Sequence, residues 1–475
     1  MNKVSEEKVK KPVALWRYIL AAVGILVMVL MILLVKPTET LPAEGVKALA
    51  VLFFMVIWWV SGICSILVTS LTGIALMLLL KVASVADIFS GFSDQTVVFL
   101  IFAFMIAAAV TKTGLGTRIA YSIMSKVKPK FGSIMIVLGI LSLVLAALIP
   151  SGSARTVLVC TIALMLLPVF NQSEDKMSNV GRGMFTLLAL NGYMGSTAYL
   201  TGGAAVILTV GLLNSAGYAI DYLHWFLMCM PPLLIATIFL ALVIPKIYKP
   251  EVESIDMVAF EKFQNELKSL GPMSAQEKKS AIIIGLVVFL WMIGSYINLS
   301  FLPVGVAGAV LLMLPGMKVI NDKDFNTRIS WDGIYFVGVC MTLGAVLSAS
   351  GVADFLANLA NPVMASNSII IYCLKVWLLA TVAHFILPSA LPALATFVPI
   401  LIASANLMGF SPLIPVIIFA VTYTGLCMPY QMVHAAIAYG FKQFASDDLL
   451  KPGIALILLW LVLTPLMTMY LGLFV

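Results

Sequence analysis

Two serine-containing breaks interrupt long apolar stretches of this sequence. They read Ile-Pro-Ser-Gly-Ser-Ala-Arg over 149–155 and Leu-Pro-Ser-Ala-Leu-Pro over 387–392. In hydrocarbon every backbone N–H and C=O must be paired within the protein, so irregular backbone survives only where it is buried or lines a cavity. Matched breaks in two halves of a chain are typical of the substrate site of a secondary transporter.

Each break would begin a new helix, and a helix start binds anions through its free N–H groups and its positive dipole end. The hydroxyls of Ser151 and Ser153 can cap that helix or donate to a carboxylate, and Gly152 allows a close backbone approach. The second break offers Ser389 and the N–H groups beyond Pro392. Two such tips facing each other would hold the two ends of a small dianion. The alternative is that the prolines merely kink ordinary spanning helices.

Four basic side chains lie close to these breaks or within apolar stretches. Arg155 is a functional candidate because a charge at that depth is unfavourable, although it could also snorkel or pair with a backbone carbonyl. His384 precedes the second break by one turn, and His434 follows a further apparent helix break at 427–431. Each histidine is either functional or a buried, hydrogen-bonded ring. Lys375 has aromatic neighbours and is expected at the membrane interface.

The composition predicts an all-α polytopic membrane protein. The 475 residues are 62% hydrophobic and 10% charged, with a mean hydropathy of +1.10, outside the range of soluble domains. About eleven stretches are long enough to span a bilayer: 14–35, 46–61, 64–81, 96–111, 183–200, 222–245, 279–297, 299–317, 333–349, 411–427 and 453–474. Segments 134–170 and 368–404 are each cut by a break, and each is either two spans or one re-entrant hairpin.

The same composition argues against several other classes. We expect a first helix that is retained rather than cleaved as a signal peptide. The six cysteines have no metal-type or paired spacing, so packing explains them and no cofactor or metal is expected. The net charge of +7 lies in loops and carries no nucleic-acid motif. A membrane enzyme would usually need a nucleophile with a base or a metal cluster, and a channel would repeat one pore segment about an axis.

An internal repeat relates the two halves of the chain. Three anchor pairs, at 93–94 with 331–332, 113–114 with 350–351, and 150–151 with 388–389, are offset by 238, 237 and 238 residues. The loop at 112–130 holds five basic residues, whereas its equivalent at 351–367 holds none. Because basic loops favour the cytoplasm, equivalent loops lie on opposite faces, and the repeat is inverted.

We expect the protein in the plasma (inner) membrane, where this orientation places the N-terminus in the cytoplasm and the C-terminus outside. The charged loop 246–279 has apolar residues at helical spacing, from Val252 and Ile255 to Leu270, and is predicted to be an amphipathic helix at the membrane surface. The predicted divisions are a cytoplasmic tail 1–13, scaffold helices 14–130, a transport region 131–245, the linker 246–279, scaffold helices 280–367 and a transport region 368–475.

At these breaks the sequence resembles the divalent anion:sodium symporter family, which includes dicarboxylate and citrate carriers. The resemblance covers most of the chain. Members carry Ser-Asn-Thr at the tips of two re-entrant hairpins, and 151–153 and 389–391 occupy those places here. Residues 150–155 are similar to the Pro-Ser-Asn-Thr-Ala-Arg version of exchanger members. Two stretches, 200–204 and 428–432, stand where the family has broken helices.

The resemblance implies a homodimer in which a transport domain moves against a scaffold in an elevator fashion. It implies di- or tricarboxylate anions of four to six carbons as substrates. The implied substrate-binding residues are Ser151, Gly152, Ser153, Arg155, Thr201, Gly202, Ser389, Ala390, Leu391, Pro429, Tyr430 and Gln431.

Departures from the family pattern bear on the coupling ion. Both Asn side chains of the motifs are absent, and the third position of the second motif is Leu391. Since a hard cation needs oxygen ligands, these losses weaken any sodium site. Arg155 near one tip and His434 near the other would supply fixed positive charge instead. We therefore expect sodium-independent antiport of dicarboxylates such as 2-oxoglutarate, succinate, malate or citrate, with a sodium- or proton-coupled symporter as the alternative.

Overall fold

The computed structural model describes residues 14–251 and 256–475, and this part of the chain contains helices and no strands. The predicted tail 1–13 and the linker residues Val252 and Ile255 lie outside the described residues. The predicted fold class is confirmed, because the described chain is an all-helical membrane protein with about ten helices apolar and long enough to span a bilayer.

A peripheral first helix, α1 (Leu15–Leu34), packs mainly on α2 and exposes most of its apolar surface. The first half then runs α2 (Ala43–Ser61), α3 (Ile66–Leu79), α4 (Val85–Ser90), α5 (Gln95–Thr113), α6 (Leu115–Met124), α7 (Phe131–Ala146), α8 (Gly152–Leu166), α9 (Asn179–Ala198), α10 (Ala204–Ser215) and α11 (Tyr222–Ile247). After α12 (Met257–Lys268) the second half runs α13 (Ala275–Ile293), α14 (Phe301–Met313), α15 (Asp322–Arg328), α16 (Trp331–Ala349), α17 (Val352–Met364), α18 (Ile369–Ile386), α19 (Ala390–Leu407), α20 (Leu413–Thr422), α21 (Val433–Gly440) and α22 (Leu450–Leu471).

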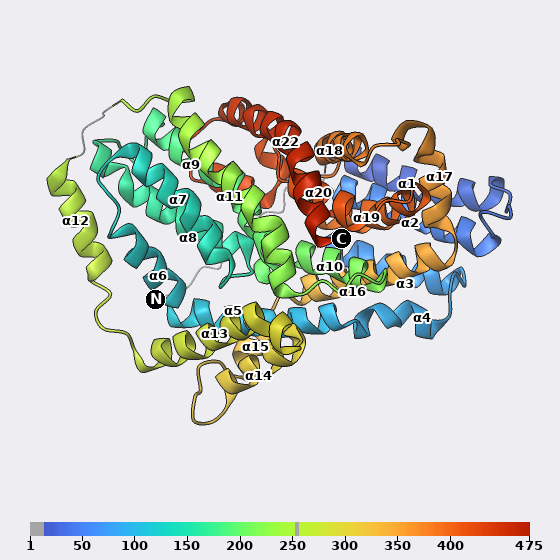
Figure 1. Ribbon diagram of the computed structural model, residues 1–475, viewed down its shortest axis with the longest axis horizontal. Coiled ribbons are helices and arrows are strands. Elements are labelled where there is room, and N and C mark those ends of the chain that lie inside the picture. Colours follow the sequence, from blue (N-terminus) through green and yellow to red (C-terminus); the bar gives the residue numbers. More distant parts are fainter. Residues whose placement is uncertain (1–13, 252–255) are drawn as a thin grey trace.

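In the described chain, the two halves each contain ten helices, α2 to α11 and α13 to α22, which correspond one to one in the same order. Equivalent helices make equivalent contacts: α7 packs on α9 and α11 as α18 packs on α20 and α22, and α5 packs on α14 as α16 packs on α3. The halves interlock, because α10 lies against α19 while α21 lies against α8 and α9. Figure 1 shows α6 to α9 gathered at one end of the molecule and α1 to α3 with α17 at the other.

The predicted spans each correspond to a helix, but the lengths differ. Three of them, at α3, α14 and α20, are shorter than a full span, whereas α8 with its short extension and α19 are long enough. Both broken segments are split close to their serines, so α8 and α19 each start there as a separate helix. The predicted linker helix is also shorter than the loop 246–279, and its buried Phe260 and Phe263 belong to the α12 face packed near α6 and α8.

Candidate functional site

Each break separates two helices. Helix α7 ends at Ala146, and after Pro150 the extended backbone of Ser151 caps α8, where its hydroxyl accepts a hydrogen bond from the Ala154 N–H at 3.4 Å. Helix α18 ends before Pro388, and Ser389 caps α19 with no side-chain hydrogen bond to that helix. Proline explains both ends, since it disfavours helical backbone in the residue before it and cannot donate an N–H.

The two tips meet at one cavity of about 360 Å³. Residues 150–153 of the first break and 388–391 of the second lie on its wall, although they are far apart in sequence. The wall also contains Phe104, Tyr193, Ser196, Gly203, Ala204, Ala205, Arg328, Ser330, Gly333, Met432, Val433 and His434. A cavity of this size is large enough for a small organic acid.

Four helices begin at this cavity. For α8, α10, α19 and α21, the N-cap residue and the first two helical residues all line the wall. In α10, α19 and α21 no side chain caps the first N–H groups, so these donors have no side-chain acceptor. A helix start carries about half a positive charge, and four of them directed at one cavity favour a bound anion.

Among the described residues that line this cavity, Arg328 is the one charged side chain, and it is positive. No acidic residue among the described positions lines the cavity. His434 lies on the wall as well, and its Nε2 is 3.5 Å from the Ser196 hydroxyl. Together with the helix starts, this arrangement suits a carboxylate-bearing ligand and disfavours a cation.

Arg155 is fully buried behind the first tip and does not line the cavity. Its guanidinium donates from Nη1 to the Ile149 carbonyl at 2.8 Å, and from Nη2 to the Gly192 carbonyl at 3.0 Å and the Ser196 hydroxyl at 2.6 Å. It therefore ties the tip to α9, and Ser196 connects it to the cavity wall. These contacts match one of the alternatives raised for Arg155 from the sequence, a pairing with backbone carbonyls.

In the second half, two aromatic residues, Tyr423 and His384, hold the tip where Arg155 holds it in the first half. The Tyr423 hydroxyl donates to the Leu387 carbonyl at 2.5 Å. Leu387 stands directly before Pro388, as Ile149 stands directly before Pro150. His384 is buried, stacks on Tyr423, and bonds through Nδ1 to the Gly425 carbonyl at 2.8 Å. His384 is thus a buried, hydrogen-bonded ring that fixes the second tip to the α20–α21 segment.

His434 lies against the first tip, which corrects the expectation that it stands near the second. A Cβ added to Gly152 would be only 2.0 Å from its Nε2. The reason is the interlocked topology, because α21 of the second half packs on α8 and α9 of the first. The imidazole therefore fills the space next to position 152, where the related family carries an Asn side chain.

A sodium ion does not fit the first tip well. Three oxygens beside the tip, the carbonyls of Ile149 and Gly192 and the Ser196 hydroxyl, already accept hydrogen bonds from Arg155. The space beside Gly152 holds His434. The side chains of Arg155 and His434 carry nitrogen and no oxygen, so neither can supply the oxygen ligand that sodium requires. These oxygen acceptors therefore match the guanidinium of Arg155, and their hydrogen bonds to it would compete with a bound sodium ion.

Several predicted residues lie near the cavity without lining it. Thr201 is buried and its hydroxyl is 3.3 Å from the Tyr222 hydroxyl, while Gly202 is packed against the backbone of α9. Gln431 is buried too, and its Oε1 accepts from two backbone N–H groups, at 2.7 and 2.8 Å, in the break between α20 and α21. Pro429 is buried and Tyr430 is exposed, and neither is on the cavity wall.

Sequence reasoning did not place in the site the residues at the ends of the stretches 200–204 and 428–432, or those just beyond them. Gly203 to Ala205 and Met432 to Val433 reach the cavity, because the helix start, and not the break itself, points at it. It also missed Arg328 and Ser330. A signal was available there, since both residues lie within three positions of the repeat anchor at 331–332.

Lys375 donates from Nζ to the Ala365 carbonyl at 2.7 Å and is not on the cavity wall.

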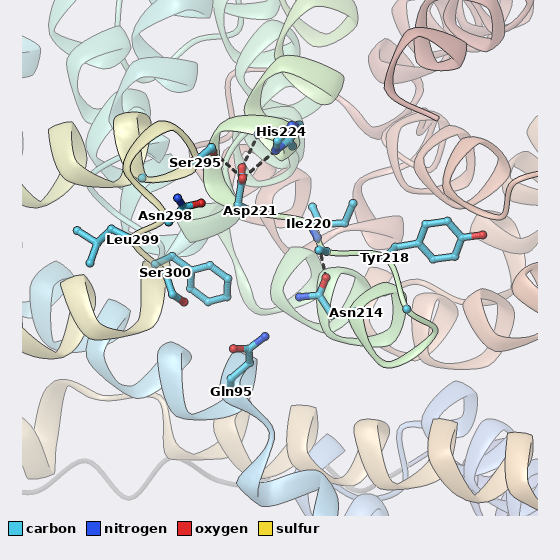
Figure 2. Close-up of a pocket in the computed structure, with 14 residues that line it drawn as sticks. Gln95, Asn214, Tyr218, Ile220, Asp221, His224, Ser295, Asn298, Leu299 and Ser300 are labelled. Carbon is cyan, nitrogen blue, oxygen red and sulfur yellow. Dashed lines mark hydrogen bonds and ion pairs between the residues drawn. The ribbon is translucent and has the colours of Figure 1, made fainter.

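A second, larger cavity of about 500 Å³ lies at the loops before α11 and after α13. Figure 2 shows Asp221 between His224 and Ser295, with hydrogen bonds of 2.8 and 2.5 Å to the Asp221 carboxylate. Neither tip reaches this cavity, and its carboxylate would repel an anion. We therefore do not take it as the anion site.

The fold and the first cavity together define a polytopic membrane carrier built from two repeats. Residues 14–474 match the family described as "Sodium:sulfate symporter transmembrane region", and the chain belongs to this family, the divalent anion:sodium symporters. Among its relatives, the L-tartrate/succinate antiporter of Escherichia coli (strain K12) is 26% identical over 391 residues, which cover 79% of this chain and 78% of that protein. A Bacillus subtilis (strain 168) protein, YflS, named as a candidate malate transporter, is 29% identical over 304 residues, 62% of this chain and 61% of that protein.

Two solved structures share the fold. The YdaH transporter of Alcanivorax borkumensis aligns with a TM-score of 0.53 and 13% identity over 96% of this chain and 97% of that one. MtrF of Neisseria gonorrhoeae, described among antimetabolite efflux pumps, aligns with a TM-score of 0.57 and 13% identity over 94% of each chain. At this identity the likeness concerns the arrangement of helices alone.

Proposed function

We propose that the protein is a secondary transporter that exchanges four- to six-carbon dicarboxylates, such as 2-oxoglutarate, succinate, malate or citrate, without sodium. The observation that carries this proposal is the start of four helices at one cavity whose described wall has no acidic residue. Free helix N–H groups recognise carboxylates in the same way as they recognise phosphates. The names of the tartrate/succinate and malate relatives support the same substrate class.

Substrate binding would use both tips. The hydroxyls of Ser151, Ser153 and Ser389 and the N–H groups at the starts of α8 and α19 would each hold part of the dianion, and α10 and α21 would close the other sides. A dianion spans the two tips, whereas a monoanion leaves one tip unpaired. The site should therefore discriminate in favour of two carboxylates.

Independence from sodium would follow from Arg155. A guanidinium that donates to the tip, to α9 and to Ser196 supplies permanently the positive charge that a bound sodium ion supplies transiently. A mobile cation leaves with the substrate, but an arginine cannot. The empty site then keeps its charge, which opposes return of the unloaded carrier, and obligatory exchange is the outcome.

The wider arrangement belongs to the same proposal. The regions 131–245 and 368–475 would move together against 14–130 and 280–367 as an elevator, with 134–170 and 368–404 as re-entrant hairpins. The protein would be a homodimer in the plasma membrane, with its N-terminus in the cytoplasm and the two repeats inverted. The interlocking of α10 with α19 and of α21 with α8 supports a single moving body that contains both tips.

Proteoliposomes test the exchange directly. Labelled succinate should enter vesicles preloaded with succinate or malate and should fail to accumulate in empty vesicles. Accumulation in empty vesicles under an inward sodium or proton gradient would instead support the coupled symporter, which the family description favours. A thermal-shift screen of organic acids, with inorganic sulfate as the comparison anion, would then rank the substrates.

A further inference from the structure

Arg328 brings a full positive charge to the cavity from outside the two hairpins. It is the last residue of α15, its side chain is 41% exposed, and it lines the same cavity as both tips. Ser330, the N-cap of α16, lies beside it on the wall and makes no capping hydrogen bond with its hydroxyl. The cavity wall therefore combines helix starts with a guanidinium and a hydroxyl.

We infer that Arg328 is a substrate-binding residue that contacts one carboxylate of the dianion and sets the preference for two carboxylates over one. This inference rests on the proposed transport of dicarboxylates and adds a recognition group that the family resemblance does not supply.

The guanidinium is held in position by a carboxylate. Nε of Arg328 donates to Oδ1 of Asp324 at 2.9 Å, one helical turn earlier. Neither Nη1 nor Nη2 has a hydrogen-bond partner among the described residues, so both remain available for a ligand. An arginine fixed at Nε presents two N–H groups in the fork geometry that matches a carboxylate.

Asp324 is itself fixed from several directions. Its Oδ2 accepts from Lys112 Nζ at 2.6 Å and from the Asn321 N–H at 3.0 Å. Burial alone would raise the pKa of the Asp324 carboxyl, but the hydrogen bonds from its two basic neighbours and from a backbone N–H lower it below its usual value. The carboxylate therefore stays ionised at neutral pH and keeps Arg328 oriented.

The charges of this cluster do not cancel. Lys112 and Arg328 carry two positive charges against the single negative charge of Asp324, so that one positive charge remains beside the cavity. Lys112 balances Asp324 from the side of α5, which leaves the charge of Arg328 free to act on the cavity. A residual charge at a partly enclosed wall attracts an anion more strongly than the same charge in open solvent.

The equivalent place in the first half has no such group. There α4 ends at Ser90, and the following Gly91 is packed against α16, where an added Cβ would be 2.5 Å from the Gly338 carbonyl. The Thr342 hydroxyl donates to the Ile88 carbonyl at 2.6 Å in the same contact. The repeat therefore does not require a cation at this position, and Arg328 distinguishes one wall of the cavity from its counterpart.

Two substitutions of Arg328 test the inference in reconstituted exchange. Arg328→Gln should raise the KM for succinate about tenfold or more, the effect of one charge-assisted hydrogen bond, and Arg328→Lys should recover part of it. Lys323→Gln is the matched control, because it removes a positive charge from the exposed side of the same helix, away from the cavity. It should leave KM unchanged.

A ligand with one carboxylate separates recognition from a merely structural role. Wild-type protein should prefer succinate to succinamate, in which an amide replaces one carboxylate, and Arg328→Gln should reduce this preference about tenfold. Asp324→Asn should also raise the succinate KM, as Arg328→Gln does, since Arg328 loses its orienting partner.

The outcomes distinguish the two proposals. If wild-type vesicles exchange no dicarboxylate, the proposed function fails and Arg328 has no role to test. If wild-type vesicles exchange succinate but Arg328→Gln keeps both the wild-type KM and the wild-type preference over succinamate, the inference about Arg328 is overturned. Should the Gln variant not fold, the same two measurements on Arg328→Lys decide, because geometry alone changes there and KM must still rise.

Discussion

Replacing Gly152 with alanine tests the contact between His434 and the first tip. The added Cβ would lie 2.0 Å from Nε2 and 3.0 Å from the Ser196 hydroxyl. The ring would have to move by roughly 1.5 Å to reach ordinary van der Waals separation. His434 is only 7% exposed, so it has little room to do so.

The magnitude follows from overpacking. Inserting one methyl group into a filled site costs about 1–3 kcal/mol, which corresponds to roughly 5- to 150-fold in an equilibrium constant. Because Gly152 and His434 both line the cavity, we expect most of this loss in the affinity for succinate. The assay is the succinate KM for exchange in preloaded proteoliposomes, with thermal unfolding in detergent to measure the effect on stability.

A double mutant makes the test specific. His434→Ala removes the ring, so Gly152→Ala should cost little in that background, and the two losses should be strongly non-additive. Gly132→Ala is the control, because a Cβ added there meets nothing within 4 Å. A Gly152→Ala variant with the wild-type KM, or strictly additive losses in the double mutant, would refute this account of the tip.

Three further predictions concern the groups around the site. Arg155→Gln should lower the temperature of unfolding and abolish exchange, since each buried acceptor that loses its donor costs about 1–3 kcal/mol; Arg182→Gln, which breaks a partly exposed pair with Asp448, should cost at most about 1 kcal/mol. Gln431→Ala should also destabilise the protein in thermal unfolding, because two backbone N–H groups lose their acceptor. The lowered pKa of Asp324 stabilises the fold above the unfolded pKa of about 3.9, and this contribution is lost as pH falls through the lower folded value; Asp324→Asn should flatten the pH dependence of unfolding in that acid range.

The architecture could be predicted because it depends on local signals. Apolar stretches of spanning length fixed the positions of most helices, and proline fixed the two breaks to within a residue or two. The repeat could also be predicted from the sequence, because anchor pairs such as 150–151 and 388–389 recur at a nearly constant offset. The helix lengths were less accurate, because α3, α14 and α20 start later and end earlier than their apolar stretches do.

The site was only partly predictable because it is formed by contacts across the halves. Nothing local indicates that His434 faces the first tip, which results from α21 packing on α8. Nor could sequence show that Arg155 bonds to oxygens behind the tip, while Arg328 from α15 reaches the cavity wall. Residues next to a motif in sequence, such as Gln431, turned out to hold the broken helix together.

The central claim is exchange that needs no sodium, and one measurement tests it most directly. Initial rates of labelled succinate uptake into succinate-loaded proteoliposomes would be compared in sodium and in choline media, across a range of sodium concentrations. We predict equal rates and an equal KM throughout, because the Arg155 guanidinium already donates to the Ile149 and Gly192 carbonyls and to the Ser196 hydroxyl beside the first tip. Uptake that requires sodium, or that rises saturably with it, would contradict the account.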